Sequence, residues 1–185
     1  ANRLGGNSLL DILVFGRISG RNAALYAKHK MQSEISIKVI EQEGQKICRP
    51  FEIQGTRAIE IKKRLQALMW NKAGIVRNEA QLNSALKEIK NVRKDAERIG
   101  VRGSRVYNHD WIQYIDVMAM IPVCEMIVSS ALMRKESRGA HYRSDYPEKN
   151  ESWLKNIIVT KDGGNLKLLL RTVPEVPERL KIFLK

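Results

Sequence analysis

Apolar side chains recur at the spacing of an amphipathic helix in three consecutive stretches of the chain, and the connections between these stretches are short and polar. The first stretch covers residues 57–77, where Gly74 ends or loosens the helix. The second begins at Asn78, a good N-cap residue, and stops at Gly100. The third, DWIQYIDVMAMIPVCEMIVSSALMRKESRG, is strongly apolar, and Pro122 inside it predicts a kink or a break. The apolar faces of the first two stretches consist of Ile61, Leu65, Leu68 and Met69, and of Leu82, Ala85, Leu86, Ile89, Val92, Ala96 and Ile99.

These stretches predict a mainly α protein in which residues 57–138 form an antiparallel three-helix bundle, spectrin-repeat-like in its arrangement. The composition changes after Gly139, where WLKNIIVTKDGGNLKLLLRTV contains two β-rich runs separated by KDGGN, a strong signal for a hairpin. Residues 139–185 are therefore expected to form a loop and a small β-hairpin tail. Residues 31–56 are expected to be an irregular connector, although partial alternation in SEISIKVIEQEGQKI would also allow a short strand pair.

Residues 1–30 are predicted to form a glycine turn and a helix. Gly5 and Gly6 permit backbone angles that other residues avoid, and Asn7 and Ser8 are good N-cap residues before the apolar run SLLDILVF. Further along this helix, two more glycines lie four residues apart on one face, in FGRISG. Because a helix-interior glycine costs about 1 kcal/mol relative to alanine, the pair suggests close packing against a backbone or a flat ligand.

The start of this helix is also a candidate anion site. A helix N-terminus presents unpaired N–H groups and a partial positive charge. Arg3 stands just before it and can hold a carboxylate or phosphate through two parallel hydrogen bonds. An ordinary turn with a surface arginine explains the same residues, so both interpretations stay open on this stretch alone.

The formal net charge is +13, with a pI of about 9.9, which raises the possibility of a basic helical module that binds nucleic acid. However, basic and acidic residues alternate along helical segments such as KEIKNVRKDAERI, as is typical of a solvated helix face. No recognition-helix or RNA-binding signature accompanies the charge, so nucleic acid is not the expected partner. No run of about 18 apolar residues or signal-peptide pattern appears, so no membrane span is expected.

The chemistry-bearing residues indicate neither a metal site nor a self-contained active site. Cys48 and Cys124 are far apart and are expected to be reduced thiols, and the three histidines have no metal-ligand spacing. Phosphate-binding, dinucleotide-binding and nucleophile-elbow motifs are also missing. We therefore expect no catalytic residue in this chain.

One further stretch, RKESRGAHYRSDYPE, is dense in charge at the end of the third predicted helix. Helix termination with a surface salt-bridge cluster would explain it, because cations are favourable at a helix C-terminus. A loop that orders itself against a cofactor domain or a partner would explain it equally well. Its candidate residues are Arg134, Lys135, Glu136, Arg138, His141, Arg143, Asp145 and Tyr146.

Four of these stretches together resemble a known family. NRLGGNSLLD followed by VFGR resembles a late flavin-contacting segment of the succinate dehydrogenase and fumarate reductase flavoprotein subunits. MWNKAGIVRNEAQL, SALMRKESRGAHYRSDYPEKNESWLKN and IIVTKDGGNLKLLL resemble later segments of the same subunits, in the same order. L-aspartate oxidase and adenylylsulfate reductase flavoproteins share this architecture and remain alternatives.

The resemblance implies roles for four residues at the start of the chain. Arg3 matches an arginine that binds a carboxylate of the dicarboxylate substrate, succinate or fumarate. Ser8 and Leu9 match residues whose backbone meets the pyrimidine edge of the FAD ring, and Asn7 is expected to belong to the same cofactor site. A helix beginning near Ser8 would direct its positive end towards the flavin and favour the negative charge of the reduced ring. Residues 1–30 would then be the end of an FAD-binding domain.

The family's dinucleotide-binding fingerprint and capping domain lie upstream of the matching segments. The resemblance therefore implies a C-terminal part of a flavoprotein, with FAD held mostly by the missing N-terminal part. The expected partners are the rest of that subunit, an iron–sulfur subunit and the dicarboxylate. The complex is expected to be cytoplasmic and peripheral on the inner face of the cell membrane through other subunits. We expect the chain alone to be inactive.

Overall fold

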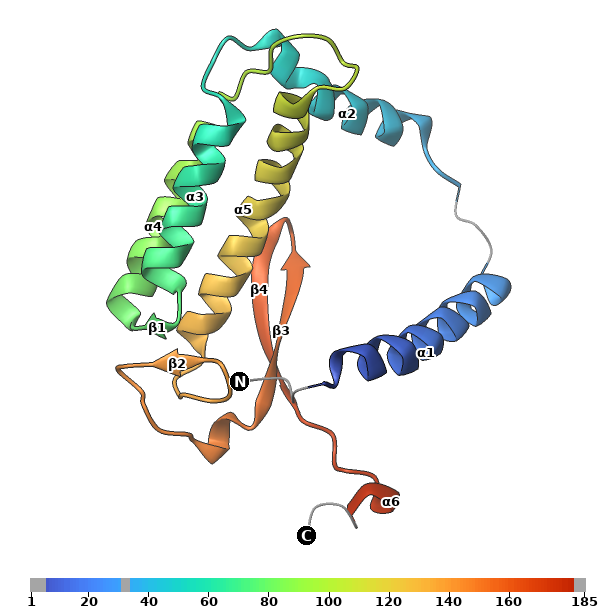
Figure 1. The fold of residues 1–185 in the computed structure, drawn as a ribbon, viewed down its shortest axis with the longest axis vertical. Helices are drawn as coiled ribbons and strands as arrows, with labels where there is room; N and C mark the ends of the chain where they lie inside the picture. The colour runs from blue at the N-terminus through green and yellow to red at the C-terminus, as the bar shows by residue number, and fades with distance from the viewer. Residues whose placement is uncertain (1–5, 31–33, 182–185) are drawn as a thin grey trace. The chain divides into compact units, whose positions relative to one another are not determined.

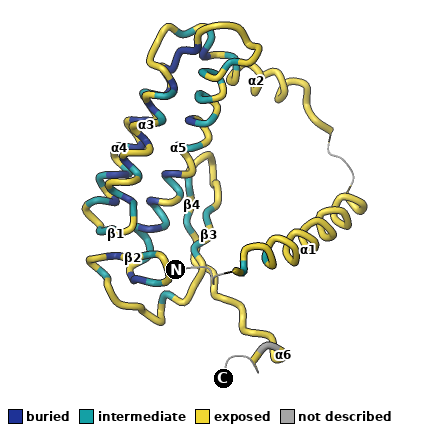
Figure 2. The backbone as a smooth tube through the Cα atoms, viewed as in Figure 1, coloured by how far each residue is buried: buried dark blue, intermediate teal, exposed yellow. Residues whose placement is uncertain are grey.

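The computed structural model describes residues 6–30 and 34–181, and these fall into two compact units, 1–49 and 50–185 (Figure 1). The smaller unit contains helix α1 (Ser8–His29) and helix α2 (Ile37–Cys48), and neither helix has a buried residue. Figure 2 shows both as exposed along nearly their whole length, whereas the second unit has an inner core. The two units therefore differ in kind, because only the larger one buries its own apolar side chains.

Helix α2 corrects the expectation of a strand pair or an irregular excursion over these residues. Ser36 is its N-cap, and the N–H of Val39 donates to the Ser36 carbonyl at 2.9 Å. Ile37, Ile40 and Ile47 recur at helical spacing and share one face. The alternation that suggested strands covers only the first few residues of this segment. Over its whole length the apolar residues follow the period of a helix, and the segment is therefore helical.

The larger unit is built on the three predicted helices: α3 (Ala58–Ala73), α4 (Glu79–Ala96) and α5 (His109–Met133). Each packs against the other two, which confirms the three-helix bundle. The predicted faces supply the core, since Ile61, Leu65 and Leu68 of α3 are buried. On α4 the buried residues are Leu82, Ala85, Ile89, Val92 and Ala96, and on α5 they are Val117, Ile121, Cys124, Val128 and Ala131.

Helix α5 runs through Pro122 as one helix, so the break, one of the two predicted alternatives beside a kink, does not occur there. By length and composition alone α5 could cross a membrane, contrary to the expectation from the sequence. Its buried residues recur at intervals of four and three and pack in the core of the bundle. We therefore attribute its apolar character to its place in the bundle.

Short elements connect and extend the bundle. The 3₁₀ turn η1 (Arg49–Glu52) precedes it, and β1 (Val76–Arg77) pairs in parallel with β2 (Tyr142–Arg143). The 3₁₀ turn η2 (Glu151–Trp153) leads into the predicted hairpin, in which β3 (Lys155–Asp162) pairs antiparallel with β4 (Asn165–Thr172). Gly163 and Gly164 form its turn with φ of +55° and +89°, angles that favour glycine. The short helix α6 (Glu178–Lys181) follows.

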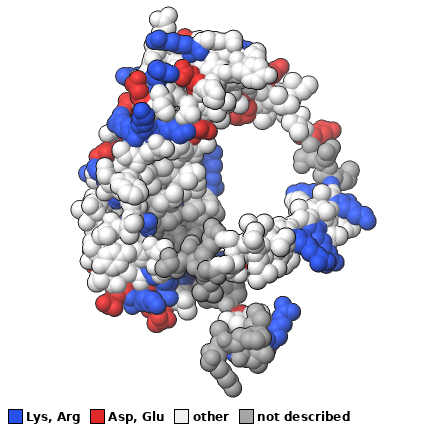
Figure 3. Space-filling view, viewed as in Figure 1, with Lys and Arg blue, Asp and Glu red and all other residues white. Residues whose placement is uncertain are grey.

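Charges of both signs cover the bundle. On the face drawn in Figure 3, Lys and Arg lie beside Asp and Glu around its upper end. Ion pairs cross between helices, including Lys62 with Asp116 at 2.8 Å and Arg93 with Glu125. The basic residues on this face therefore do not form one continuous patch of the kind that nucleic acid requires.

Gly100 lies where the chain before α3 crosses the end of α4. Its N–H donates to the Thr56 carbonyl at 3.1 Å, and a Cβ at this position would lie 2.3 Å from the Ile53 carbonyl oxygen. Helix α4 has already ended at Ala96. Glycine is therefore needed here for the close approach of two backbones, and not to stop the helix as the sequence suggested.

Gly100→Ala is expected to lower the free energy of unfolding by about 1–3 kcal/mol, because backbone must move to admit the methyl group. Urea denaturation followed by circular dichroism would measure the change. Gly44→Ala in α2 is the control for a methyl group that meets no described atom within 4 Å, and it should not destabilise the chain, because alanine is favoured over glycine inside a helix. Equal stability of the wild type and Gly100→Ala would show that the crossing does not require glycine.

Candidate functional site

The start of α1 is the candidate cofactor contact. The helix begins at Ser8 with Asn7 as its N-cap, as predicted. Gly6 precedes it with φ of +78°, an angle that favours glycine, and no described atom lies within 4 Å of its Cβ position. Arg3, the expected carboxylate-binding residue, lies outside the described residues.

The side chain of Asn7 does not cap the helix through a hydrogen bond. Its Nδ2 donates instead to Oδ1 of Asp11 at 3.3 Å, and the N–H of Asp11 donates to the Asn7 carbonyl at 3.0 Å. An α-helix leaves its first N–H groups without partners within the helix, and Leu9 here is 74% exposed. Ser8 and Leu9 are both exposed, so the main chain of this turn is open to the approach of a planar ligand.

The rest of α1 lacks the close packing that its glycines suggested. No described atom lies within 4 Å of the Cβ positions of Gly16 and Gly20. Apolar side chains are exposed along the helix, namely Leu9, Leu10, Ile12, Leu13, Val14, Phe15, Ile18, Leu25 and Tyr26. A helix that is apolar on so many sides is typical of a buried position, so α1 has the composition of an element that another part of a protein covers.

The charged stretch after α5 folds into a partly buried network. Glu136 is fully buried, and its Oε1 accepts from Nη1 of Arg134 at 2.7 Å and from Nε of Arg138 at 2.9 Å. Its Oε2 accepts from the N–H of Asn150 at 3.0 Å. Burial alone would raise the pKa of Glu136, but these hydrogen bonds outweigh it and hold the pKa at about 2. The carboxylate therefore stays ionised and ties the loop together.

Arg143 is the second buried charge of this network. Its Nη1 donates to the carbonyls of Ala131 at 2.9 Å and Leu132 at 3.2 Å, in the last turn of α5. Its Nε and Nη2 each donate to Asp145 at 2.7 Å, a bidentate pair that holds the pKa of Asp145 at about 2. Asp145 in turn accepts from the N–H of Glu79 at 2.9 Å, in the first turn of α4. A cation thus meets one helix C-terminus and an anion meets another helix N-terminus.

His141 lies beside this network with one side toward Arg77. Its Nδ1 accepts from Nη1 of Arg77 at 2.9 Å, and its Nε2 is buried without a hydrogen bond to a described residue. Burial, together with the nearby charges of Arg77, Arg143 and Arg134, lowers the pKa of His141. The imidazole is therefore neutral near pH 7, which makes it a structural acceptor for Arg77 in this arrangement.

The structure shows a salt-bridge cluster at the end of α5, but Glu136 and Arg143 at its centre are buried and not at the surface. The other interpretation, a loop that orders itself against a cofactor domain or a partner, stays a prediction. Sequence analysis missed three members of the network: Arg77, Glu79 and Asn150. Glu79 and Asn150 act through backbone N–H groups, which no side-chain pattern reveals. Arg77 joins because β1 pairs with β2, a contact across more than 60 residues. Among the described residues, no group of His, Cys, Asp or Glu is arranged to hold a metal.

Glu136→Gln is expected to lower the free energy of unfolding by about 1.5–3 kcal/mol near neutral pH, because it removes the buried negative charge to which two partly buried guanidinium groups donate. The folded-state pKa of Glu136 is depressed, so its contribution is complete above its ordinary pKa of 4.5 and is lost as pH falls towards about 2. Urea denaturation across this range should show the wild type and the variant converging. Glu60→Gln, at an exposed position, is the control and should differ little at any pH; a gap that stays constant with pH would contradict the assignment.

The sequence and the fold of this chain match those of a known protein family. A family model described as the fumarate reductase flavoprotein C-terminal region matches residues 62–181. An uncharacterised FAD-dependent oxidoreductase of Methanocaldococcus jannaschii is 36% identical over 161 residues, which cover 86% of this chain and 29% of the relative. The fumarate reductase flavoprotein subunit of Mycobacterium tuberculosis is 32% identical over 179 residues, covering 91% of this chain and 31% of the subunit.

A solved structure agrees with these sequence matches. The Mycobacterium smegmatis Sdh1 complex in the apo form contains a chain that is 33% identical and superposes with a TM-score of 0.89, over 98% of this chain and 32% of its own length. The chain thus spans about 30% of the length of its relatives and corresponds to a C-terminal part of them. It belongs to the C-terminal domain family of the succinate dehydrogenase and fumarate reductase flavoprotein subunits.

Proposed function

We propose that this chain acts as the C-terminal part of a flavoprotein that interconverts succinate and fumarate. The observation that carries the proposal is the start of α1, where Gly6, Asn7 and Ser8 form an accessible helix N-terminus on a helix with no buried residue. Its relatives are flavoprotein oxidoreductases, and one of them is named as FAD-dependent, which supports FAD as the cofactor. L-aspartate oxidase and adenylylsulfate reductase types remain alternatives for the whole protein.

In this proposal the backbone at Ser8 and Leu9 holds the pyrimidine edge of the flavin, and Asn7 fixes the first turn through Asp11. FAD supplies hydride exchange with the dicarboxylate when it is bound. The partial positive charge of the α1 N-terminus stabilises negative charge on the ring. Arg3 binds a substrate carboxylate, because a guanidinium presents two parallel donors to it. This chain supplies positioning and charge, and no catalytic residue of its own.

We propose that the rest of the flavoprotein packs on the apolar side chains that α1 exposes, and that it holds most of the FAD. An iron–sulfur subunit is the proposed electron acceptor, and relatives occur in multi-subunit complexes. We also propose a cytoplasmic location, peripheral on the inner membrane face through other subunits.

The purified chain, given FAD, succinate and a dye acceptor, is expected to show no turnover, because most of the cofactor site lies elsewhere. Joined to the preceding part of the flavoprotein, it is expected to support succinate oxidation. In that joined protein, Arg3→Gln should lower kcat/KM by about tenfold to a hundredfold, since a charged hydrogen bond to substrate is lost.

Arg171→Gln, at an exposed position on β4, is the matched control and should leave kcat/KM unchanged. Turnover by the chain alone would contradict the proposed division of the site. Equal kcat/KM for Arg3→Gln and the wild type would remove Arg3 from substrate binding.

A further inference from the structure

The loop after α5 meets the end of α3 where β1 pairs with β2 (Figure 1). The N–H of Ser144 donates to the Arg77 carbonyl at 2.8 Å, so the backbones of the two segments are joined. The Arg77 side chain donates from Nη1 to Nδ1 of His141 at 2.9 Å, and from Nε to two carbonyls at the end of α3. A backbone hydrogen bond and a side-chain hydrogen bond therefore hold the same β1–β2 contact.

The side-chain hydrogen bond fixes the protonation state of His141. A guanidinium has only donors, so Nδ1 accepts from Arg77 only while it carries no proton. The proton of the neutral ring is then on Nε2, which is buried and has no hydrogen bond to a described residue. A second proton would go to Nδ1, where it would face the N–H of Arg77. Protonation of the ring and the Arg77 hydrogen bond therefore exclude each other.

The surroundings of His141 oppose that second proton. Burial has the largest effect, and the positive charges of Arg77 on β1, Arg143 on β2 and Arg134 at the C-cap of α5 act in the same direction. The Arg134 carbonyl acts against them but is outweighed, so the pKa of His141 is lowered.

The other side of the ring adds no excess of negative charge. The charged residues that line a cavity there with His141 are Arg138, Glu148 and Lys149. The nearby carboxylates of Glu136 and Asp145 are already paired with arginines. An imidazolium at this position would thus have no carboxylate of its own among the described contacts.

The charged partners in this network keep their charge around neutral pH. Glu136 and Asp145 have pKa values of about 2, and guanidinium groups stay protonated throughout this range. A change in pH between about 7.5 and 5.5 therefore acts on these partners through His141.

We propose that His141 is a pH-sensitive switch of the β1–β2 contact, which is closed when the ring is neutral and released when it is protonated. In the released state Arg77 turns away from the ring and the Ser144 N–H becomes open to water. Arg143 still holds the carbonyls of α5, and Asp145 still holds the N–H of Glu79, so the release is local. The switch does not depend on the proposed flavoprotein activity.

The direction of the switch follows from the lowered pKa. The closed state lowers the pKa of His141 below its ordinary value of 6.5, so the released state binds the proton more readily. The contribution of His141 to the closed state is complete above pH 6.5 and is lost as the pH falls from there towards the lowered pKa. At about pH 5.5 the equilibrium shifts towards release by up to about tenfold.

The test is amide hydrogen exchange of the full chain followed by NMR, with each rate compared with the intrinsic rate at the same pH. Protection of the Ser144 N–H should fall by about threefold to tenfold between about pH 7.5 and pH 5.5. Because the release is local, low urea should not accelerate this exchange, whereas it should accelerate exchange of the buried Ile89 in α4.

His141→Gln is the main variant, because its amide oxygen can accept from Arg77 but does not gain a proton. Its Ser144 N–H should be equally protected at both pH values. His109→Gln, at an exposed position in the same unit, is the matched control and should keep the fall in protection.

Arg77→Gln tests the switch even if His141→Gln fails to fold. Removal of this positive charge should move the titration of the His141 ring signal to higher pH, whereas Arg64→Gln, at an exposed position on α3, should leave it in place.

Three results would each overturn the inference. The first is an unchanged protection of Ser144 between the two pH values, or a fall that persists in His141→Gln. The second is an unchanged His141 titration in Arg77→Gln. The third is exchange of Ser144 with the same protection and urea dependence as Ile89, because the contact would then open only when the whole bundle unfolds.

Discussion

The buried guanidinium of Arg143 is the interaction on which the larger unit depends. Its position is fixed on two sides. Its N–H groups donate to carbonyls in the last turn of α5 on one side and to both carboxylate oxygens of Asp145 on the other. Asp145 then receives the first-turn N–H of Glu79 in α4. One side chain with no exposed surface thereby links the end of one bundle helix to the start of another. Leaving such a charge unpaired would be strongly destabilising, so the loop has little freedom to fold elsewhere.

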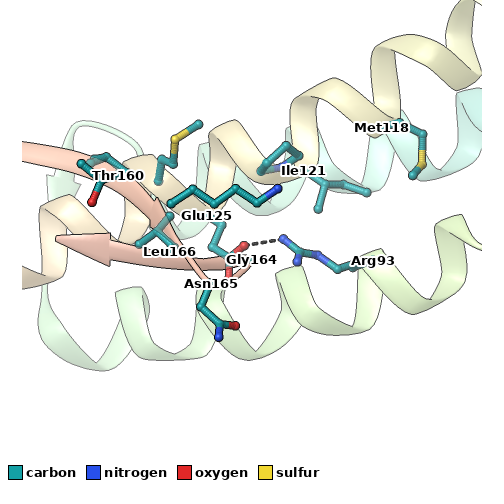
Figure 4. A pocket seen from close by; sticks show the side chains of 12 residues that line it. Arg93, Met118, Ile121, Glu125, Thr160, Gly164, Asn165 and Leu166 are labelled. Atoms are coloured by element: carbon teal, nitrogen blue, oxygen red, sulfur yellow. Dashed lines mark hydrogen bonds and ion pairs between the residues drawn. The ribbon is translucent and has the colours of Figure 1, made fainter. Parts of the chain in front are cut away.

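This junction also decides where the hairpin lies. Glu136, buried two residues beyond the α5 C-cap, holds Arg134 and Arg138, and Arg134 extends to the carbonyls of Trp153 and Lys155 at 3.0 and 2.7 Å. Lys155 is the first residue of β3. The hairpin is therefore attached to the bundle through charged hydrogen bonds at its base, and its far end lines a cavity together with α5 (Figure 4). A cavity between the two elements follows from this attachment at one end.

The two units of the chain have contrasting physical requirements. The bundle buries its own apolar faces and satisfies its internal charges, so it has the features of a self-supporting domain. Helix α1 does not bury its own apolar face. Its apolar side chains are exposed, and no described atom lies within 4 Å of the Cβ positions of Gly16 and Gly20. Its composition suits a place inside a larger protein, in keeping with a family in which this chain matches less than a third of its solved relative's length.

The sequence by itself determined the three helices, their buried faces, the hairpin and the start of α1 at Ser8, because these depend on local periodicity, capping and turn residues. The sequence suggested an irregular connector or a short strand pair where α2 is helical, and a helix-stop role for Gly100 where two backbones cross. Only the tertiary structure decided that Glu136 and Arg143 are buried, that Arg77 meets His141, and that Asp145 reaches Glu79. These contacts join residues at least 12 positions apart in the chain, and three of the four use backbone groups that every residue has. Periodicity cannot encode such partners, since they are chosen by the packing of the helices that brings them together.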